Sequence, residues 1–439
     1  MAFLKRNSLS GVHVPHRKEN TEDLPAVRMP VPSKVYISMQ QHIGAPCKPL
    51  VKKGDAVKVG QLIGTSEAFV SVPVHSSVSG TVVDMIEIIN VNSVRAVCVV
   101  IETDGLQTVD ESVRPPEVHD TAGFIAAIRD SGLVGLGGAG FPTFIKLNPK
   151  NIDQVDTLVV NGAECEPYIT SDYRTMMDHT DDVFEGIALL RKYLTLSHVY
   201  IGIEKNKPKA ISLMRERAAQ IGGIEIVELD AKYPKGAEKV IAYETTGRMV
   251  PEGKLPNDVG LIVSNVTSIA FMAQYMRTGM PLIEKTLTVD GSAVTHPQNV
   301  TVLIGTTCSD VFDFCGGYRT EPRLLLYGGP MMGSAILSDT YPIIKNNNAL
   351  LAFAETGEEF MRESPCIRCG KCIQMCPYRL MPSQFEAAYK ARDLESLNKL
   401  KVNLCMECGC CSYICPARRP LVQINRLAKS LLREQAKKA

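Results

Sequence analysis

Cys366-Ile-Arg-Cys369-Gly-Lys-Cys372-Ile-Gln-Met-Cys376-Pro377 and Cys405-Met-Glu-Cys408-Gly-Cys-Cys411-Ser-Tyr-Ile-Cys415-Pro416 are two runs of one pattern near the C-terminal end of the chain. In both, four cysteines are separated by two, two and three residues, and a proline follows the fourth. This spacing is typical of 4Fe–4S clusters, because one tight loop can supply three of the four thiolates that the corners of a cube require. In two-cluster domains, the fourth cysteine of each run binds the other cluster. The runs predict one cluster on Cys366, Cys369, Cys372 and Cys415, and a second on Cys376, Cys405, Cys408 and Cys411.

The pattern is that of bacterial ferredoxins, and the other uses of clustered cysteines fit it less well. Zinc sites usually combine two cysteine pairs across a longer gap. Disulfide frameworks are typical of small secreted chains. Cys410 is out of register and is interpreted as a non-ligand. Residues 381–400, between the runs, have the apolar spacing of a helical insertion, which we expect to pack over the clusters.

The composition is that of a globular protein with several domains. The 439 residues predict about three domains, and the apolar and charged fractions of 45% and 22% are ordinary. A net charge of +1 argues against a nucleic-acid partner. No apolar run reaches the ~18 residues of a membrane helix, and no apolar signal core opens the chain. Six cysteines outside the ligand set show no pairing pattern, as expected in the cytoplasm.

The N-terminal region is predicted to be coil followed by short strands. Gly11–Lys18 is polar and interrupted by proline, and alternating strands follow Pro32. The stretches Val51–Gly64 and His75–Val82 resemble the barrel-sandwich hybrid of biotinyl and lipoyl carriers. The modifiable-lysine signature of those carriers is missing, so we interpret this region as a structural or docking module.

The middle of the chain alternates between apolar strands and helical spans. Strands are predicted at 157–160, 198–203, 224–229 and 259–263, with helices such as 123–130, 183–193 and 207–220. This alternation predicts a parallel sheet covered on both faces. Strands at 285–291, 299–305 and 323–327, with a short helix at 308–315, then fit a small β-grasp domain. After Asn348 we expect the chain to become helical.

A glycine-rich loop precedes the first parallel strand. Glycines in Gly135–Gly140 allow positive φ and let backbone amides approach a phosphate. The loop matches neither the Walker A motif nor the dinucleotide-binding G-x-G-x-x-G after a strand. Taken alone, the glycines fit a structural turn as well as a phosphate loop.

Neighbouring segments favour the phosphate loop. Gly135-x-Gly-Gly-Ala-Gly140-Phe141-Pro-Thr, followed by Lys146, is similar to the FMN loop of the NADH-binding flavoprotein subunit of respiratory complex I. Asn161–Pro167, Tyr233–Glu238 and Asn265–Ser268 resemble further segments of that family, in the same order. The resemblance implies that FMN and NAD(H) bind to residues Gly135, Gly137, Gly138, Ala139, Gly140, Phe141, Lys146, Asn161, Glu164, Glu166, Tyr233, Gly236, Glu238, Asn265 and Thr267. Within this set it places Glu166 and Phe141 toward the nicotinamide nucleotide.

The sequence departs from the complex I pattern at three positions. Leu136 stands where that family has arginine, Ala163 where it has aspartate, and Ala237 where it has glutamate. Fewer polar contacts to flavin or NADH are therefore expected.

The whole chain resembles the RnfC family, which belongs to the Rnf complex, a membrane complex that transfers electrons between ferredoxin and NAD and couples the transfer to ion pumping. The opening Gly11-Val-His-Val-Pro-His-Arg-Lys18 and the order of the regions carry this resemblance. It implies an oxidoreductase subunit in which hydride exchange occurs at FMN and single electrons pass through two 4Fe–4S clusters. The implied partners are the other subunits, NAD(H) and, indirectly, ferredoxin, with the chain peripheral on the cytoplasmic side of the cell membrane.

The expected architecture is a multidomain α/β protein. It comprises N-terminal coil and a barrel-sandwich hybrid (1–120), a Rossmann-like FMN/NADH-binding domain (121–280), an SLBB-like β-grasp domain (281–345) and a helical two-cluster domain (346–439). One alternative is a cobalamin reductase of the propanediol microcompartment type, in which the flavin domain precedes the barrel-like segment. Another is an iron–sulfur relay adaptor without flavin.

Overall fold

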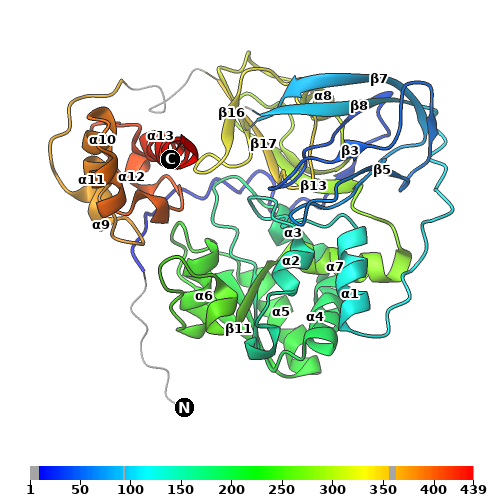
Figure 1. Cartoon of the computed structure of the whole chain (residues 1–439), viewed down its shortest axis with the longest axis horizontal. Helices are drawn as coiled ribbons and strands as arrows, with labels where there is room; N and C mark the ends of the chain where they lie inside the picture. Colours follow the sequence, from blue (N-terminus) through cyan, green and yellow to red (C-terminus); the bar gives the residue numbers. More distant parts are fainter. Residues whose placement is uncertain (1–8, 92–93, 355–361, 439) are drawn as a thin grey trace.

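The computed structural model describes residues 9–91, 94–354 and 362–438. Figure 1 shows an N-terminal β region in blue, an α/β region in cyan and green, a second β region in yellow, and a helical region in orange and red. The four regions follow the order expected from the sequence.

The first region is built from two antiparallel sheets. Its core side chains alternate along the strands, as in a sheet with one buried face: Val35, Ile37, Val99 and Ile101 are all buried. This arrangement agrees with the expected barrel-sandwich hybrid. One sheet contains β2 (Lys34–Ser38), β8 (Arg95–Thr103), β7 (Gly80–Ile89) and β4 (Ala56–Val57), and the other β3 (Lys48–Pro49), β5 (Leu62–Thr65) and β6 (Val74–His75).

The second region contains a parallel four-stranded sheet in the order β11-β10-β9-β12. Its strands are β9 (Thr157–Asn161), β10 (His198–Glu204), β11 (Ile224–Leu229) and β12 (Leu261–Asn265). Its helices are α1 (Thr121–Asp130), α2 (Thr143–Leu147), α3 (Ser171–Asp178), α4 (Thr180–Leu194), α5 (Pro208–Ile221), α6 (Glu238–Thr246) and α7 (Val266–Thr278). The expected strand–helix alternation is therefore confirmed.

Helices cover both faces of this sheet. One hydrophobic cluster joins Leu158 and Ile201 to residues of α1, α4, α5 and α7. A second cluster joins Val159 and Val263 on the other face to Ile241 of α6. Strands buried on both faces explain why their sequences are continuous apolar runs.

The third region is a mixed sheet in the order β1-β14-β13-β17-β15-β16, with helix α8 (Cys308–Phe314). Its strands are β1 (Val27–Arg28), β13 (Glu284–Asp290), β14 (Gln298–Leu303), β15 (Leu324–Tyr327), β16 (Ser334–Ile336) and β17 (Ala349–Phe353).

Two of these strands differ from the sequence-based expectation. The prediction that the chain becomes helical after Asn348 is wrong, because residues Ala349–Phe353 form β17 between β13 and β15. A run of five buried apolar residues has no periodicity that separates a strand from a helix. In addition, β1 of the N-terminal coil pairs with β14, so this segment leaves the barrel and joins the third region.

The fourth region carries the two cysteine runs on short helices. Residues 381–400 form two helices, as expected, and Phe385 from this insertion is fully buried. The helices are α9 (Lys371–Gln374), α10 (Pro382–Lys390), α11 (Leu394–Lys399), α12 (Cys410–Tyr413) and α13 (Leu421–Lys438). Among the residues that the structure describes, no helix combines the length and apolar composition needed to cross a bilayer.

Candidate functional site

The parallel sheet has a topological switch point between β9 and β12. The chain proceeds from β9 to β10 and β11 on one side, whereas β12 lies on the other side of β9. The last residues of these two strands, Asn161 and Asn265, are direct neighbours in the register. Open α/β sheets bind ligands beyond the carboxyl ends of their strands at such a point. Asn161 and Asn265, both candidate flavin residues from the sequence, therefore lie at this switch point.

Asn265 organises the start of α7. Its Oδ1 accepts hydrogen bonds from the backbone amides of Thr267 (3.0 Å) and Ser268 (3.2 Å), and its Nδ2 donates to Asp172 Oδ2 (2.7 Å). Thr267 Oγ1 donates to the other oxygen of Asp172 (2.7 Å). Asp172 thus orients two candidate flavin residues. Asp172 was not among the residues predicted from the sequence, although an acidic residue in the first turn of a helix was a usable signal.

The glycine loop lies against Asn265. A Cβ at Gly137 would stand 2.5 Å from Asn265 Nδ2, so only glycine permits this approach. Gly140 has a φ of +70°, a conformation that also favours glycine. Gly137, Gly138 and Ala139 are exposed, whereas Leu136 is buried. The loop therefore presents backbone rather than side chains, which suits a phosphate-bearing ligand.

Contacts from other regions hold the glycine loop. The backbone amide of Leu136 donates to Ser268 Oγ (3.0 Å), and Asn346 Nδ2 donates to the carbonyl of Gly138 (2.7 Å). The amide of Ile43 in the barrel donates to the carbonyl of Gly140 (3.1 Å). Three regions of the molecule thus converge on this loop.

Lys146 and Glu238 form an ion pair beside the strand ends. Lys146 Nζ lies 2.6 Å from Glu238 Oε1 and donates to the carbonyl of Val263 in β12 (3.0 Å). Both side chains are partly exposed. The ammonium therefore remains accessible to an anionic group near the loop.

Asn161 connects β9 to the Tyr233–Glu238 segment. Its Nδ2 donates to the carbonyl of Gly236 (2.8 Å), and its Oδ1 accepts from the amide of Ala163 (3.2 Å). The amide of Gly236 in turn donates to the Cys165 thiol (3.3 Å). Segments far apart in the sequence are thereby fixed next to each other.

Glu164, which the resemblance places in the flavin pocket, contacts the start of α3. Its two carboxylate oxygens accept from the amides of Asp172 (2.6 Å) and Tyr173 (3.2 Å), in the first turn of α3. Burial raises the pKa of this carboxyl to about 7. A buried carboxylate requires donors, and the start of α3 supplies them, so Glu164 anchors this helix.

Two buried lysines secure the loop after β9. Lys18 Nζ donates to the carbonyls of Glu164 (2.8 Å) and Ile169, and Lys207 Nζ donates to the carbonyl of Ala163 (2.7 Å). Glu164 has a positive φ of 46°, so its peptide adopts an uncommon conformation that these contacts hold. Lys18 belongs to the Gly11–Lys18 segment noted in the sequence, but its partner 146 residues away could not be read from it.

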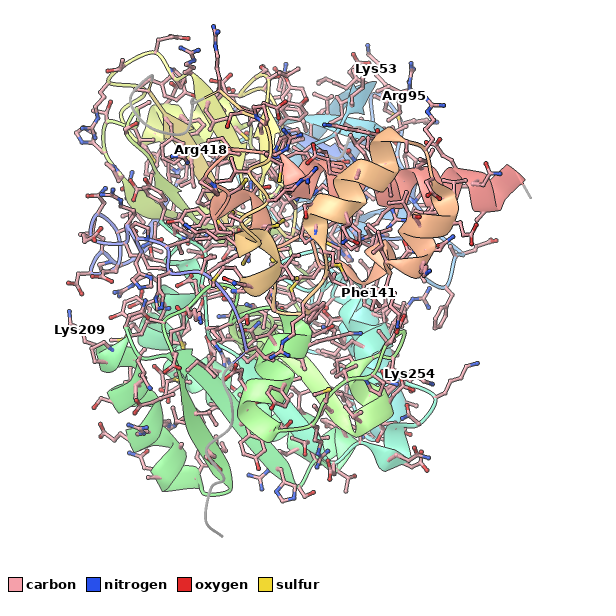
Figure 2. All side chains as sticks on the ribbon, turned by 90° about the vertical axis from the view of Figure 1, so that its left-hand side faces the viewer. Lys53, Arg95, Phe141, Lys209, Lys254 and Arg418 are labelled. Atoms are coloured by element: carbon pink, nitrogen blue, oxygen red, sulfur yellow. The ribbon has the colours of Figure 1, made fainter. Side chains whose placement is uncertain are left out.

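Glu166, which the resemblance places toward the nicotinamide nucleotide, contacts the third region of the molecule. Its carboxylate accepts from the amides of Met331 (3.0 Å) and Met332 (2.9 Å), in the turn between β15 and β16. Burial raises the pKa of this carboxyl to about 7. Both oxygens are thus occupied by the third region of the molecule. Phe141, expected at the same ligand, is partly buried and is marked in Figure 2 at the upper edge of the green and cyan domain.

Tyr233 lies between the α/β domain and the cysteine domain. Its backbone pairs with Val12 of the N-terminal segment through two hydrogen bonds of 2.8 and 3.0 Å. Its side chain belongs to one buried cluster with Val12, Val14, Cys408 and Cys410. The candidate flavin region therefore touches the second cysteine run directly.

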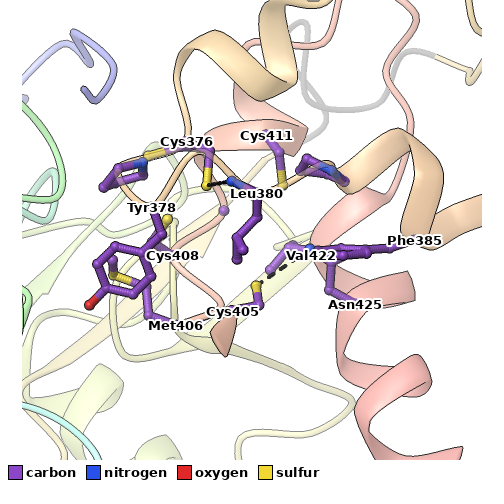
Figure 3. A pocket seen from close by; sticks show the side chains of 14 residues that line it. Cys376, Tyr378, Leu380, Phe385, Cys405, Met406, Cys408, Cys411, Val422 and Asn425 are labelled. Atoms are coloured by element: carbon purple, nitrogen blue, oxygen red, sulfur yellow. Dashed lines mark hydrogen bonds between the residues drawn. The ribbon is translucent and has the colours of Figure 1, made fainter. Parts of the chain in front are cut away.

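Cysteines of the two runs meet in one pocket. Cys376 of the first run lines it together with Cys405, Cys408 and Cys411 of the second (Figure 3). Amide groups donate to the sulfurs: Leu380 to Cys376, and Glu407 and the Asn425 side chain to Cys405, each at 3.4 Å. N–H donors of this kind are typical of cluster thiolates, so this set, here called the inner set, fits a 4Fe–4S cluster.

The remaining four cysteines lie nearer the surface. Cys372 and Cys415 both pack against Cys411, Leu421 and Val422, whereas Cys366 and Cys369 are exposed. The amide of Arg368 donates to Cys366 Sγ (3.4 Å). We call Cys366, Cys369, Cys372 and Cys415 the outer set. Cys410, interpreted from the sequence as a non-ligand, also lines the pocket of the inner set, and its thiol lies 3.9 Å from the Tyr233 carbonyl.

The fold and these residues define a class: a multidomain electron-transfer protein that joins a flavin-type α/β domain to a two-run iron–sulfur domain. Four family models match the chain and agree with this class. They are the RnfC barrel sandwich hybrid domain (7–106), the Nuo51 FMN-binding domain (128–274), the SLBB domain (286–335) and a 4Fe-4S dicluster domain (363–418).

Whole-chain relatives identify the family. The chain is 42% identical to component C of the proton-translocating ferredoxin:NAD(+) oxidoreductase complex of Clostridium ljungdahlii, over 90% of this chain and 86% of the relative. It is also 42% identical to component C of the Na(+)-translocating complex of Acetobacterium woodii, over 88% of this chain and 87% of the relative. The chain belongs to the RnfC family, whose members are components of the ion-translocating ferredoxin:NAD(+) oxidoreductase complexes known as Rnf complexes.

A solved structure supports the fold. An NAD+-reducing [NiFe]-hydrogenase in the air-oxidised state aligns with a TM-score of 0.51 and 16% identity, over 72% of this chain and 63% of that chain. At this identity the likeness concerns the fold alone.

Proposed function

We propose that this chain exchanges a hydride with NAD(H) at a bound FMN and relays single electrons through two 4Fe–4S clusters within an ion-translocating membrane complex. Family membership supports the complex, and the FMN-binding and dicluster matches support the cofactors. The hydride exchange, the number of clusters and the residues at each site are the parts that we propose.

One observation carries the proposal. Tyr233, from the segment that resembles the flavin site, shares a buried cluster with Cys408 of the inner set and with Cys410. The edge expected to bind flavin and the ligands of an iron–sulfur cluster are thus connected through protein packing. A relay between two cofactors requires such proximity, whereas two independent binding modules do not.

The residues around the switch point would hold the flavin. The proposed contacts are Gly135, Gly137, Gly138, Ala139, Gly140, Lys146, Asn161, Glu164, Tyr233, Gly236, Glu238, Asn265 and Thr267, with Glu166 and Phe141 toward the nucleotide. The exposed loop backbone and the Lys146 ammonium suit a phosphate, and the amides of Asn161 and Asn265 suit polar ring edges. FMN, when bound, supplies the conversion between two-electron and one-electron chemistry.

The two cysteine sets would have different roles in electron transfer. The inner set, next to Tyr233, is placed to communicate with the flavin domain. The outer set contains two exposed cysteines and is placed to communicate with another protein. In this proposal the chain is peripheral on the cytoplasmic side of the membrane, the other members of the complex are its partners, and ferredoxin acts indirectly. The ranges 1–120, 121–280, 281–345 and 346–439 remain proposed boundaries, except that the last division moves beyond Phe353, because β17 belongs to the third sheet.

An anaerobic titration with NADH tests the function. The purified, cluster-reconstituted chain with FMN should show flavin bleaching followed by cluster reduction, and iron analysis should give about eight atoms per chain. Clusters that accept electrons from dithionite but not from NADH, with no retained flavin, would leave the flavin-less relay adaptor as the function.

The cobalamin reductase alternative is disfavoured by domain order. In that type the flavin domain comes before the barrel-like segment, whereas here the barrel match ends at residue 106 and the FMN-binding match begins at residue 128.

A further inference from the structure

A buried lysine reaches the glycine loop from the third region of the molecule. Lys285 is the second residue of β13 and is only 4% exposed. Its Nζ donates to the carbonyl of Leu136, within the loop, over a long distance of 3.4 Å. Burial lowers the pKa of this ammonium to about 8, and the carboxylates of Asp172 and Glu164 oppose the lowering. A buried ammonium is unfavourable unless carboxylates compensate it.

Lys285 completes a clamp on Leu136. The amide of Leu136 donates to Ser268 Oγ at the start of α7, and its carbonyl accepts from Lys285. Both backbone polar groups of this residue are therefore held by side chains from other elements. Leu136 lies between Gly135 and Gly137, so the clamp restrains a segment whose flanking glycines allow many backbone conformations.

Lys285 also interacts electrostatically with Asp172. The Asp172 carboxylate accepts from Asn265 Nδ2 and Thr267 Oγ1, two proposed flavin contacts. Asp172 is also the carboxylate that most opposes the lowering of the Lys285 pKa, so the ammonium interacts with the residue that holds this pair. One ammonium thus supports the glycine loop directly and the Asn265–Thr267 pair indirectly.

We propose that Lys285 is a positioning residue of the flavin site, supplied by the β-grasp sheet, which preorganises the glycine loop and gives the site a positive field. This inference rests on the proposed function, since it concerns the same site. Reduction makes a flavin more electron-rich, and a buried cation favours that form because little water screens its charge. The Leu136 position lacks the arginine of the complex I pattern, and Lys285 brings a cation to the same loop from another domain.

FMN affinity and the flavin midpoint potential of the cluster-reconstituted chain test this role. K285M should raise the Kd for FMN about ten-fold, which is the effect of losing one charge-assisted hydrogen bond. It should also make the midpoint potential of the bound flavin more negative. K285R should restore the potential. D172N, which removes the opposing charge, should shift the potential in the positive direction. A purely structural defect would not produce shifts of opposite sign.

K345M is the matched control. Lys345 is 1% exposed and also joins regions of the molecule, through the carbonyls of Pro73 (2.8 Å) and Gly132 (2.7 Å), neither of which is a proposed flavin contact. We expect K345M to retain the wild-type potential. Equal potentials in wild type, K285M and D172N would overturn the role of Lys285 while leaving the proposed function intact. If K285M does not fold, the sign of the potential shift in D172N decides whether the charge near the loop affects the flavin. A wild-type chain that binds no FMN would overturn both proposals.

Discussion

The two cysteine runs share their local geometry. Gly370 and Gly409 stand at the same place in each run, with φ of +73° and +80°. The amide of Arg368 donates to Cys366 Sγ as the amide of Glu407 donates to Cys405 Sγ, each at 3.4 Å. The same spacing thus produces the same loop twice.

The surroundings of the two loops differ. Residues 362–369 are exposed, and Ile367 retains 67% of its accessible surface, whereas Cys408, Gly409 and Cys410 are buried. Lys371 of the first run corresponds to Cys410 of the second, which packs against Tyr233. Local sequence therefore shapes each cysteine loop, while docking against the α/β domain determines which loop is shielded.

The largest expected effect comes from removing one ligand of each set. C408A and C369A should each lose about half of the roughly eight iron atoms. NADH should still reduce the remaining cluster in C369A, because the inner set stays next to the flavin domain. In C408A this reduction should be lost, since the retained set is the outer one. Stopped-flow absorbance checks the difference, and equal rates would contradict the assigned order.

In the unmodified protein, the two cysteine sets should lose their iron at different rates. A chelator with mild oxidant should release about half of the iron in a fast phase, because the outer set includes exposed Cys366 and Cys369. The cluster that remains after this phase should still be reducible by NADH. Single-phase release of all iron would show that burial does not protect the inner set.

Substituting alanine for Gly370 and Gly409 compares how much each loop contributes to the free energy of unfolding. G370A should cost about 1 kcal/mol, the strain of a left-handed residue, since a Cβ there has open space within 4 Å. G409A should cost roughly 1–3 kcal/mol more, because its Cβ would lie 2.9 Å from the Met331 carbonyl. Urea unfolding followed by cluster absorbance checks both. Equal losses would mean that the contact with Met331 relaxes freely.

The smallest effect on stability is expected at Arg368 and Glu407, which occupy equivalent positions in the two cysteine loops. Both have a left-handed φ, of 56° and 60°. Glu407 pairs with Arg426 (3.2 Å) and Lys429, so E407Q should destabilise by about 0.5–1 kcal/mol. Arg368 is exposed and has no ion pair within the described residues, so R368Q should stay within about 0.5 kcal/mol of wild type. The same urea measurement applies, and salt should reduce only the E407Q difference.

The position of a site residue could be predicted where it depends on neighbouring residues in the sequence. It could not be predicted where it depends on contacts with distant segments. Asn161 and Asn265 end strands that the apolar runs predicted, so their place at the sheet edge followed from topology. Glu164 and Glu166 belong to the same motif, but their partners in α3 and the β15–β16 turn could not be read from it. Lys285 and Asp172 carried no motif, because their roles arise only when separate segments meet.

The two cysteine loops, the glycine loop and the parallel strands could be predicted from the chain alone, since spacing, glycine freedom and apolar runs act over a few residues. Only the folded molecule reveals that β1 and β17 complete the third sheet, that the inner set packs beside Tyr233, and that the outer set stays at the surface. The physical reason is that burial and ion pairing depend on segments far apart in the chain. Lys285 and Leu136, for example, lie 149 residues apart and meet only after folding.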